Sequence, residues 1–226
     1  MRLFRTARRR AEPATRHAIA APRHRRVLRA VAGWCLQYPD HTVLDRLPLL
    51  NASLRELPEH TPGRTELDTV VAFLADTEPL ALAEHYVEVF DRKPRRTLHL
   101  SWYADGDTRR RGASLAALRR FYREHGFAPA EDELPDFLPV LLEFAAQVRD
   151  PEVADRALAG FRAGLELLHH NLGGVETAYR DAVGAVLATL PAPPAHAAPA
   201  ELPDAPGNLV EFVGLEPYPL NTGGTR

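Results

Sequence analysis

Apolar residues recur every three or four positions along most of the chain between Arg23 and Leu190. This spacing places them on one face of a helix, so the pattern predicts a succession of amphipathic helices. Further helical segments are expected over 41–57, 65–74, 79–90, 109–125, 136–148, 151–172 and 175–190. The first helix should end at Pro39, and its apolar stripe consists of Val27, Leu28, Val31, Trp34, Cys35 and Tyr38.

Strand signals are nearly absent, because no alternating run of apolar and polar residues is flanked by an Asn-Gly or Asp-Gly turn. A chain of 226 residues is suited to one domain with a sizeable core. The expected fold class is therefore all-α, a single-domain helical bundle of about eight helices.

Several predicted helix ends carry residues typical of such positions. Thr108 is suited to the N-cap of the fifth helix and Gly126 to the position after its end. Asp136 can cap the sixth helix, whose first turn tolerates Pro139, and Pro48 should bend or break the second. The stripe expected to be buried on the fifth helix consists of Leu115, Leu118, Phe121 and Tyr122.

The two ends of the chain lack this helical pattern. Residues 1–22 are expected to form a basic disordered leader, since residues 1–26 contain nine arginines and one glutamate. The helical domain should span 23–190. Residues 191–226 form a linker rich in proline and alanine and a tail. The tail contains a short apolar motif, NLVEFVGLEPYPL at 208–220, which either docks on the domain or binds a partner.

Composition narrows the functional classes. A net charge of −2 argues against a general nucleic-acid binder, and no apolar run approaches the roughly 20 residues of a membrane-spanning helix. The leader has no apolar segment after its arginines, so it does not look like a secretory signal. One cysteine, Cys35, cannot form an internal disulfide, a zinc site or an iron–sulfur cluster. A cytoplasmic protein without a metal or other cofactor is expected.

The sequence GDTRRRG at 106–112 predicts a turn followed by a capped helix start. Its structural residues are Gly106, Asp107, Thr108, Arg109, Arg111 and Gly112. Three arginines in a first helical turn are unfavourable for the helix dipole, so a carboxylate should hold at least one of them. Arg109 or Arg111 is expected to pair with one of Asp91, Asp105, Glu133, Asp136 or Glu143.

The sequence ELPDFLPVLLEF at 133–144 holds acids beside apolar residues. Glu133 and Asp136 are poor candidates for a catalytic acid–base pair, because capping already gives Asp136 a role. Glu143 lies within an apolar face and needs a partner, either an arginine of GDTRRRG or a bound peptide.

The aromatic residues of HYVEVFD at 85–91 either pack in the core or form the wall of a peptide groove. The chain contains no nucleophile elbow, P-loop or dinucleotide motif. The adjacent pair His169 and His170 would point about 100° apart on a helix, so it does not chelate one metal. Candidate peptide-binding residues combine apolar side chains with acids: Tyr86, Phe90, Asp91, Leu98, Leu100, Asp105, Glu133, Asp136, Phe137 and Glu143.

Several ordered motifs resemble one family. YVEVFD, LHLSWY, GDTRRRG, YREHGF and ELPDFLPVLLEF follow one another in the order typical of NarJ, the delta-subunit assembly chaperones of respiratory nitrate reductase. This family is related more distantly to the TorD and DmsD chaperones. The match is densest over 85–144 and weaker in the helical flanks.

The resemblance implies a TorD-like fold and a cytoplasmic chaperone that is not an enzyme. Such a protein binds the N-terminal segment of the apoprotein of the nitrate reductase catalytic (alpha) subunit. It holds that subunit competent for molybdenum cofactor insertion and assembly. The resemblance also admits molybdenum cofactor biosynthesis proteins as partners, and a monomer is favoured over a dimer.

Two other hypotheses stay open from the residues alone. A small all-α metal-dependent hydrolase would need a cluster of histidines and aspartates across helices, which the spacing neither shows nor excludes. A signalling adaptor that binds helical peptides would use the same type of groove as the chaperone.

Overall fold

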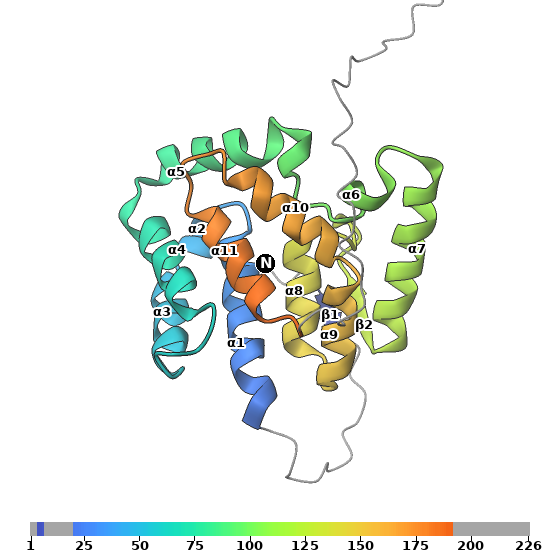
Figure 1. The fold of residues 1–226 in the computed structure, drawn as a ribbon, viewed down its shortest axis with the longest axis horizontal. Helices are drawn as coiled ribbons and strands as arrows, with labels where there is room; N and C mark the ends of the chain where they lie inside the picture. The colour runs from blue at the N-terminus through green and yellow to red at the C-terminus, as the bar shows by residue number, and fades with distance from the viewer. Residues whose placement is uncertain (1–3, 7–19, 192–226) are drawn as a thin grey trace, which may run out of the picture.

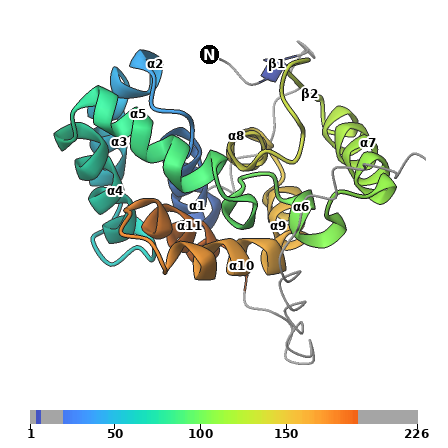
Figure 2. The same ribbon diagram turned by 90° about the horizontal axis from the view of Figure 1, so that it is seen from above.

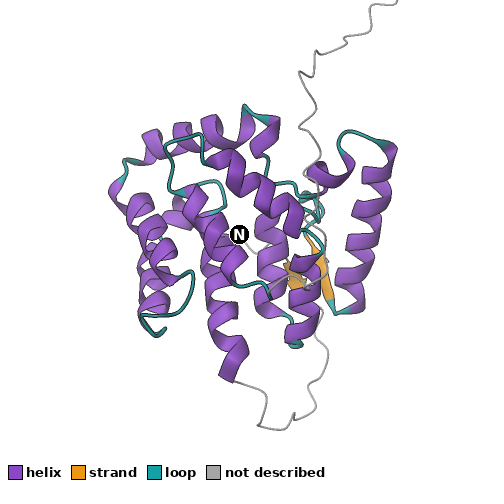
Figure 3. Ribbon diagram, in the orientation of Figure 1, coloured by secondary structure: helices purple, strands orange, loops and turns teal. Residues whose placement is uncertain are grey.

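The computed structural model describes residues 4–6 and 20–191, and its elements are almost all helical (Figures 1 and 3). The helices are α1 (Ala20–Cys35), α2 (His41–Leu44), α3 (Leu47–Arg55), α4 (Arg64–Asp76), α5 (Pro79–Tyr86), the π-helix η1 (Val87–Asp91), the 3₁₀ helix η2 (Pro94–Arg96), α6 (Ser101–Asp105), α7 (Arg109–Glu124), α8 (Leu138–Gln147), α9 (Pro151–Ala159), α10 (Arg162–Leu172) and α11 (Tyr179–Ala188). The all-α fold class is confirmed.

The structure also contains two strands that the pattern did not predict. β1 (Phe4–Thr6) pairs antiparallel with β2 (Phe127–Pro129). Strands of three residues are too short to show an alternating pattern. Residues 20–22 of the predicted leader belong to α1, which begins three residues earlier than expected. The remaining leader residues, almost all of the linker and the apolar motif at 208–220 lie outside the described residues.

Two predicted helices are each divided in the structure. The segment 41–57 is interrupted between α2 and α3, and Pro48 lies in the first turn of α3. The segment 151–172 is interrupted at Gly160 and Phe161, between α9 and α10. The breaks explain why the structure has more helices than the pattern predicted.

The predicted helix ends are partly corrected. Gly126 follows the end of α7 with φ +83°, and Thr108 occupies the N-cap of α7. The Thr108 hydroxyl donates to the Asp105 carbonyl instead of capping the helix (2.8 Å). The prediction that Asp136 caps the sixth helix is wrong. The N-cap of α8 is Phe137, and the Asp136 carboxylate is used elsewhere.

The core forms around α1, which packs against α8, α11, α4 and α3. The backbones of α1 and α8 approach closely at Gly33, where an added Cβ would lie 3.2 Å from Leu142 Cβ. Almost every residue of α8 is buried as a result, and no described helix is both long and apolar enough to cross a membrane.

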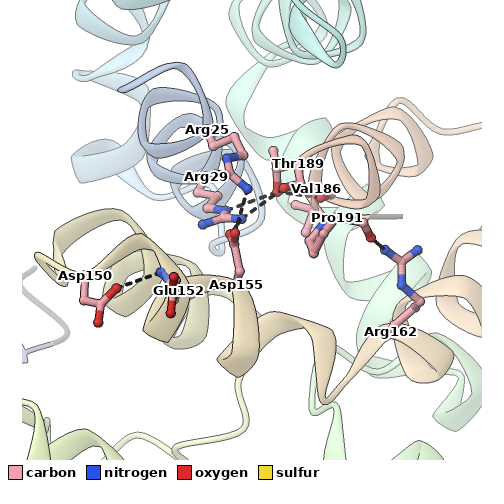
Figure 4. A network of polar contacts seen from close by, with 9 residues as sticks. All are labelled: Arg25, Arg29, Asp150, Glu152, Asp155, Arg162, Val186, Thr189 and Pro191. Atoms are coloured by element: carbon pink, nitrogen blue, oxygen red, sulfur yellow. Dashed lines mark hydrogen bonds and ion pairs between the residues drawn. The ribbon is translucent and has the colours of Figure 1, made fainter. Parts of the chain in front are cut away.

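The middle of α1 is fixed by a buried arginine (Figure 4). Arg29 is 2% exposed and donates to Asp155 on α9 (2.6 Å) and to the Thr189 carbonyl and hydroxyl after α11 (3.0 and 3.1 Å). Arg25 binds the other oxygen of Asp155 at 2.6 Å. Burial lowers the pKa of Arg29, while the Asp155 carboxylate favours its charged form. This network joins three helices that are distant in sequence.

The helix α7 is less covered than its pattern predicted. In both views it lies at one edge of the molecule, and it contacts α6 and β2 (Figures 1 and 2). Of the predicted buried stripe only Tyr122 is buried, whereas Leu115, Leu118 and Phe121 stay partly exposed. The prediction of a fully buried stripe on this helix is therefore wrong.

Replacing Asp155 by alanine should destabilise the fold strongly, because it leaves the Arg29 guanidinium buried without its carboxylate. Breaking a buried ion pair in this way typically costs about 3–5 kcal/mol. The matched control is Glu56→Ala, which removes the exposed pair between Arg23 and Glu56 and should cost about 0–1 kcal/mol. Urea unfolding measures both; equal small losses would contradict the structural role of Asp155.

Candidate peptide-binding site

The family-like motifs meet where the segment before α6 runs beside the segment before α8. His99 and Phe137 form an isolated antiparallel bridge. The Leu100 amide donates to the Asp136 carbonyl (3.0 Å), and the Leu138 amide donates to the Leu98 carbonyl (2.9 Å). LHLSWY and ELPDFLP therefore lie side by side, although more than 30 residues separate them in sequence.

The Asp136 carboxylate is fully buried at this junction. Its Oδ2 accepts from the Ser101 hydroxyl (2.5 Å) and the Ser101 amide (3.2 Å), and its Oδ1 lies 3.3 Å from His99 Nδ1. Arg111 Nη2 lies 3.6 Å from Oδ2, and Arg111 Nε donates to the Ser101 hydroxyl at 3.1 Å. The contact between Arg111 and Asp136 is one of the pairs that the sequence predicts for GDTRRRG.

These contacts decide the charge of Asp136. Burial alone would raise the pKa of this carboxyl, but the bonds from His99 and Ser101 and the charge of Arg111 outweigh it. The pKa of Asp136 therefore lies below its ordinary value. An acid that stays ionised with all its partners supplied by the protein is suited to fixing structure rather than to exchanging protons.

The remaining residues of GDTRRRG form the turn between α6 and α7. Gly106 has φ +57°, and its amide donates to the Trp102 carbonyl. Asp107, Thr108, Arg109 and Gly112 are exposed. The turn directs the Arg111 side chain toward the buried Asp136, while the Arg109 side chain is exposed to solvent.

The structure divides the predicted peptide-binding residues into two groups. Tyr86, Phe90, Leu98 and Leu100 belong to the hydrophobic core, and Asp136 is buried among its polar partners. A peptide does not reach these side chains in this conformation. The partly or fully exposed candidates are Asp91, Asp105, Glu133, Phe137 and Glu143.

Asp91 and Glu133 both act on the core residue Tyr86, whereas Phe137 lies beside His99. Burial raises the pKa of Tyr86 most, and Tyr179 and the charges of Asp91 and Glu133 raise it further. The Phe137 ring lies 5.3 Å from the His99 ring. Burial raises the pKa of Glu133, with a further contribution from Asp132, whereas His99 opposes the shift.

Tyr38 is an exposed aromatic residue beside Tyr86, and the sequence interpretation missed it. Tyr38 was expected in the buried stripe of the first helix, but α1 ends at Cys35 and the Tyr38 side chain is 49% exposed. Its ring meets the edge of Tyr86 at 5.5 Å between centroids. The position just before Pro39 was the available signal, because a proline marks a helix end. We group the exposed or partly exposed residues around Tyr86 and His99 as the acidic aromatic face: Tyr38, Asp91, His99, Glu133 and Phe137.

A groove along α5 continues from Tyr38. Its volume is about 600 Å³, and it combines apolar side chains with acids. Leu80, at 65% exposed, is the most open apolar side chain in it. The residues that define this α5 groove are Tyr38, Leu80, Ala81, Glu84, Val87 and Glu88.

The two other exposed candidates do not line the α5 groove. Asp105 lines a second groove of about 590 Å³, between α6, α7 and the junction of α9 with α10. Glu143 accepts a hydrogen bond from Gln147 in the same helix (2.7 Å), whereas Arg111 binds Asp136. Within the described ranges, no group of three His, Cys, Asp or Glu side chains is arranged to hold a metal ion.

The fold defines an all-α single-domain protein with open surface grooves, and comparison with known proteins identifies its family. The model described as "Nitrate reductase delta subunit" matches residues 58–179, which include every motif at this junction. The chain therefore belongs to the nitrate reductase delta-subunit family.

Individual relatives agree with this assignment. The chain is 32% identical to the "Probable nitrate reductase molybdenum cofactor assembly chaperone NarJ" of Bacillus subtilis (strain 168), over 69% of this chain and 83% of that protein. It is 35% identical to NarJ of Escherichia coli (strain K12), over 36% and 35% of the two chains. It is also 41% identical to the "Nitrate reductase-like protein NarX" of Mycobacterium tuberculosis (strain ATCC 25618 / H37Rv), over 57% of this chain, but it spans only 20% of that relative's length.

The Asp136 cluster should make stability depend on pH in a defined direction. A lowered pKa in the folded state stabilises it above the unfolded value of about 3.9, and this gain is lost as pH falls through the folded value. Asp136→Asn should cost about 1.5–3 kcal/mol of unfolding free energy at neutral pH. Urea unfolding of this variant and the wild type should show that difference shrinking as the pH falls below the unfolded value of about 3.9. The control Asp107→Asn changes an exposed acid and should show no such pH dependence.

Proposed function

We propose that this protein is an assembly chaperone for a nitrate reductase, and not an enzyme. It binds the N-terminal segment of the catalytic subunit before that subunit is complete, and holds it competent for molybdenum cofactor insertion. Family membership and the names of the NarJ relatives support the chaperone class. The observation that carries the binding mode is Tyr38, an exposed aromatic residue between an acidic face and an apolar groove.

The chemistry of the acidic aromatic face and the α5 groove fits an extended or helical peptide that is apolar and basic. Leu80, Val87 and Tyr38 offer apolar surface, and Glu84 borders it, while Glu88 is paired with Arg92 of the same lining at 2.9 Å. Exposed aromatic side chains commonly supply a large part of the energy in such interfaces. Rim acids add specificity and faster association more than affinity.

The buried motifs support this surface from beneath. The Asp136 cluster fixes His99, and the backbone bridge fixes Phe137 beside it. The core residue Tyr86 donates to the Leu36 carbonyl at 3.1 Å and provides the edge against which Tyr38 packs. The motifs of the family thus act as supports for the binding surface. A cytoplasmic location, a monomeric state and contact with molybdenum cofactor biosynthesis proteins remain parts of the proposal.

A peptide with the N-terminal sequence of the partner catalytic subunit should bind the purified full chain with micromolar or tighter affinity, about −8 kcal/mol. Isothermal titration calorimetry measures this directly, with a scrambled peptide of the same composition as control. Absence of binding at millimolar concentrations of the native peptide would refute the proposed binding mode.

The location of the site can be tested separately with two exposed apolar residues. Tyr38→Ala should weaken peptide binding by about 2 kcal/mol, since it removes the aromatic anchor between face and groove. Leu49→Ala is the matched control, because Leu49 is 60% exposed on α3 and lines neither surface. Circular dichroism checks that both variants are folded. Equal affinities for the two variants would place the peptide elsewhere.

A further inference from the structure

The second groove lies against the incompletely covered stripe of α7. We call it the α7 groove, defined by Asp105, Ala117, Leu118, Phe121, Gly160 and Phe161. Leu118 and Phe121 belong to the stripe that the sequence predicts to be buried, yet both stay partly exposed. A partly exposed apolar helix face can bind a further apolar segment.

The charge of α7 limits what can occupy this groove. The helix contains six arginines and one glutamate. Arg111 is used by Asp136, and Arg109, Arg110 and Arg123 are exposed outside the groove. The groove lining itself is mixed in charge, because it contains Arg120 and the acids Asp105 and Glu124. A fitting occupant is therefore mainly apolar, and the exposed arginines of α7 disfavour a strongly basic segment such as residues 1–22.

The described chain ends at Pro191, which is linked to the edge of this groove through the side chain of Arg162. Arg162 Nη2 donates to the Pro191 carbonyl at 2.5 Å (Figure 4). Arg162 directly follows Phe161, which lines the groove. Residues 192–207 separate this point from the apolar motif at 208–220. At roughly 3.1 Å per residue an extended linker of this length spans about 50 Å, so the α7 groove is well within reach.

The motif at 208–220 has the composition that the groove requires. It contains two acids, Glu211 and Glu216, and no lysine or arginine. Its apolar residues are Leu209, Val210, Phe212, Val213, Leu215 and Leu220. We propose that this segment docks in the α7 groove of its own chain, with apolar side chains on Leu118, Phe121 and Phe161 and with its acids facing the arginines of α7.

This docking covers the open stripe of α7 and leaves the acidic aromatic face and the α5 groove available to a target. The tail then packs permanently on the helical domain and does not compete with the peptide for its binding site. The proposal does not depend on the identity of that peptide, and it stands or falls separately from the chaperone function.

A cysteine pair in the full chain tests the docking. Ala117→Cys places a thiol in the groove, and Phe212→Cys places one in the motif. Under mild oxidation with glutathione disulfide this double variant should form an intramolecular disulfide several-fold faster than the control pair Ala116→Cys with Phe212→Cys. Ala116 is exposed on the same helix but does not line the groove. The native Cys35 should not interfere, because burial raises the pKa of its thiol to about 12.

The outcomes separate the proposal from its alternatives. Faster closure of the Ala117 pair within one chain supports docking, and equal rates for the two pairs overturn it, because a freely moving tail meets both positions alike. A disulfide between two chains in place of the internal one also overturns it, in favour of exchange between copies. As a second measurement, Phe212→Ser should speed hydrogen exchange over residues 115–121 and leave α4 unchanged. Unaltered exchange in α7 would contradict the docking.

Discussion

The Asp136 carboxylate has no access to solvent, so its charge must be balanced by protein groups alone. Ser101, His99 and Arg111 supply those groups from the segment before α7 and from α7 itself. His99 and Ser101 belong to LHLSWY, Arg111 belongs to GDTRRRG, and Asp136 itself belongs to ELPDFLPVLLEF. The cluster therefore requires the start of α8, the start of α6 and the first turn of α7 to meet in one arrangement, and the candidate binding surface rests on that arrangement.

The Arg29 network plays the corresponding part at the other end of the bundle. A buried guanidinium on α1 draws together α9 and the end of α11 through Asp155 and Thr189. Buried ion pairs often add little net stability, yet they are costly to break and they disfavour alternative packings. Two such clusters explain how short helices joined by tight connections hold a single arrangement around α1.

The residues that support the candidate binding surface are therefore different from the residues that a partner can contact. The most distinctive motifs of the sequence are largely internal, and the groups available to a partner lie on the rim that they support. Tyr38 and Leu80 are exposed apolar side chains outside those motifs, and acids such as Glu84 and Glu133 accompany them. Distinctive residues in this family need not touch the partner, because a binding surface depends on the rigidity of what lies under it.

Local pattern was sufficient for the helices and for many of their ends. Pro79, Pro151 and Gly126 mark boundaries through restrictions on their own backbone, and periodicity locates the core faces of α1, α5 and α8. The unfavourable first turn of α7 also indicated that an arginine there needs a carboxylate. Only the tertiary structure decided that Arg111 pairs with Asp136. It also decided that the Tyr38 side chain is exposed and that Leu118 and Phe121 are partly exposed. Amphipathic spacing is a property of neighbouring residues, whereas a partner or an exposed face depends on which distant segments pack against it.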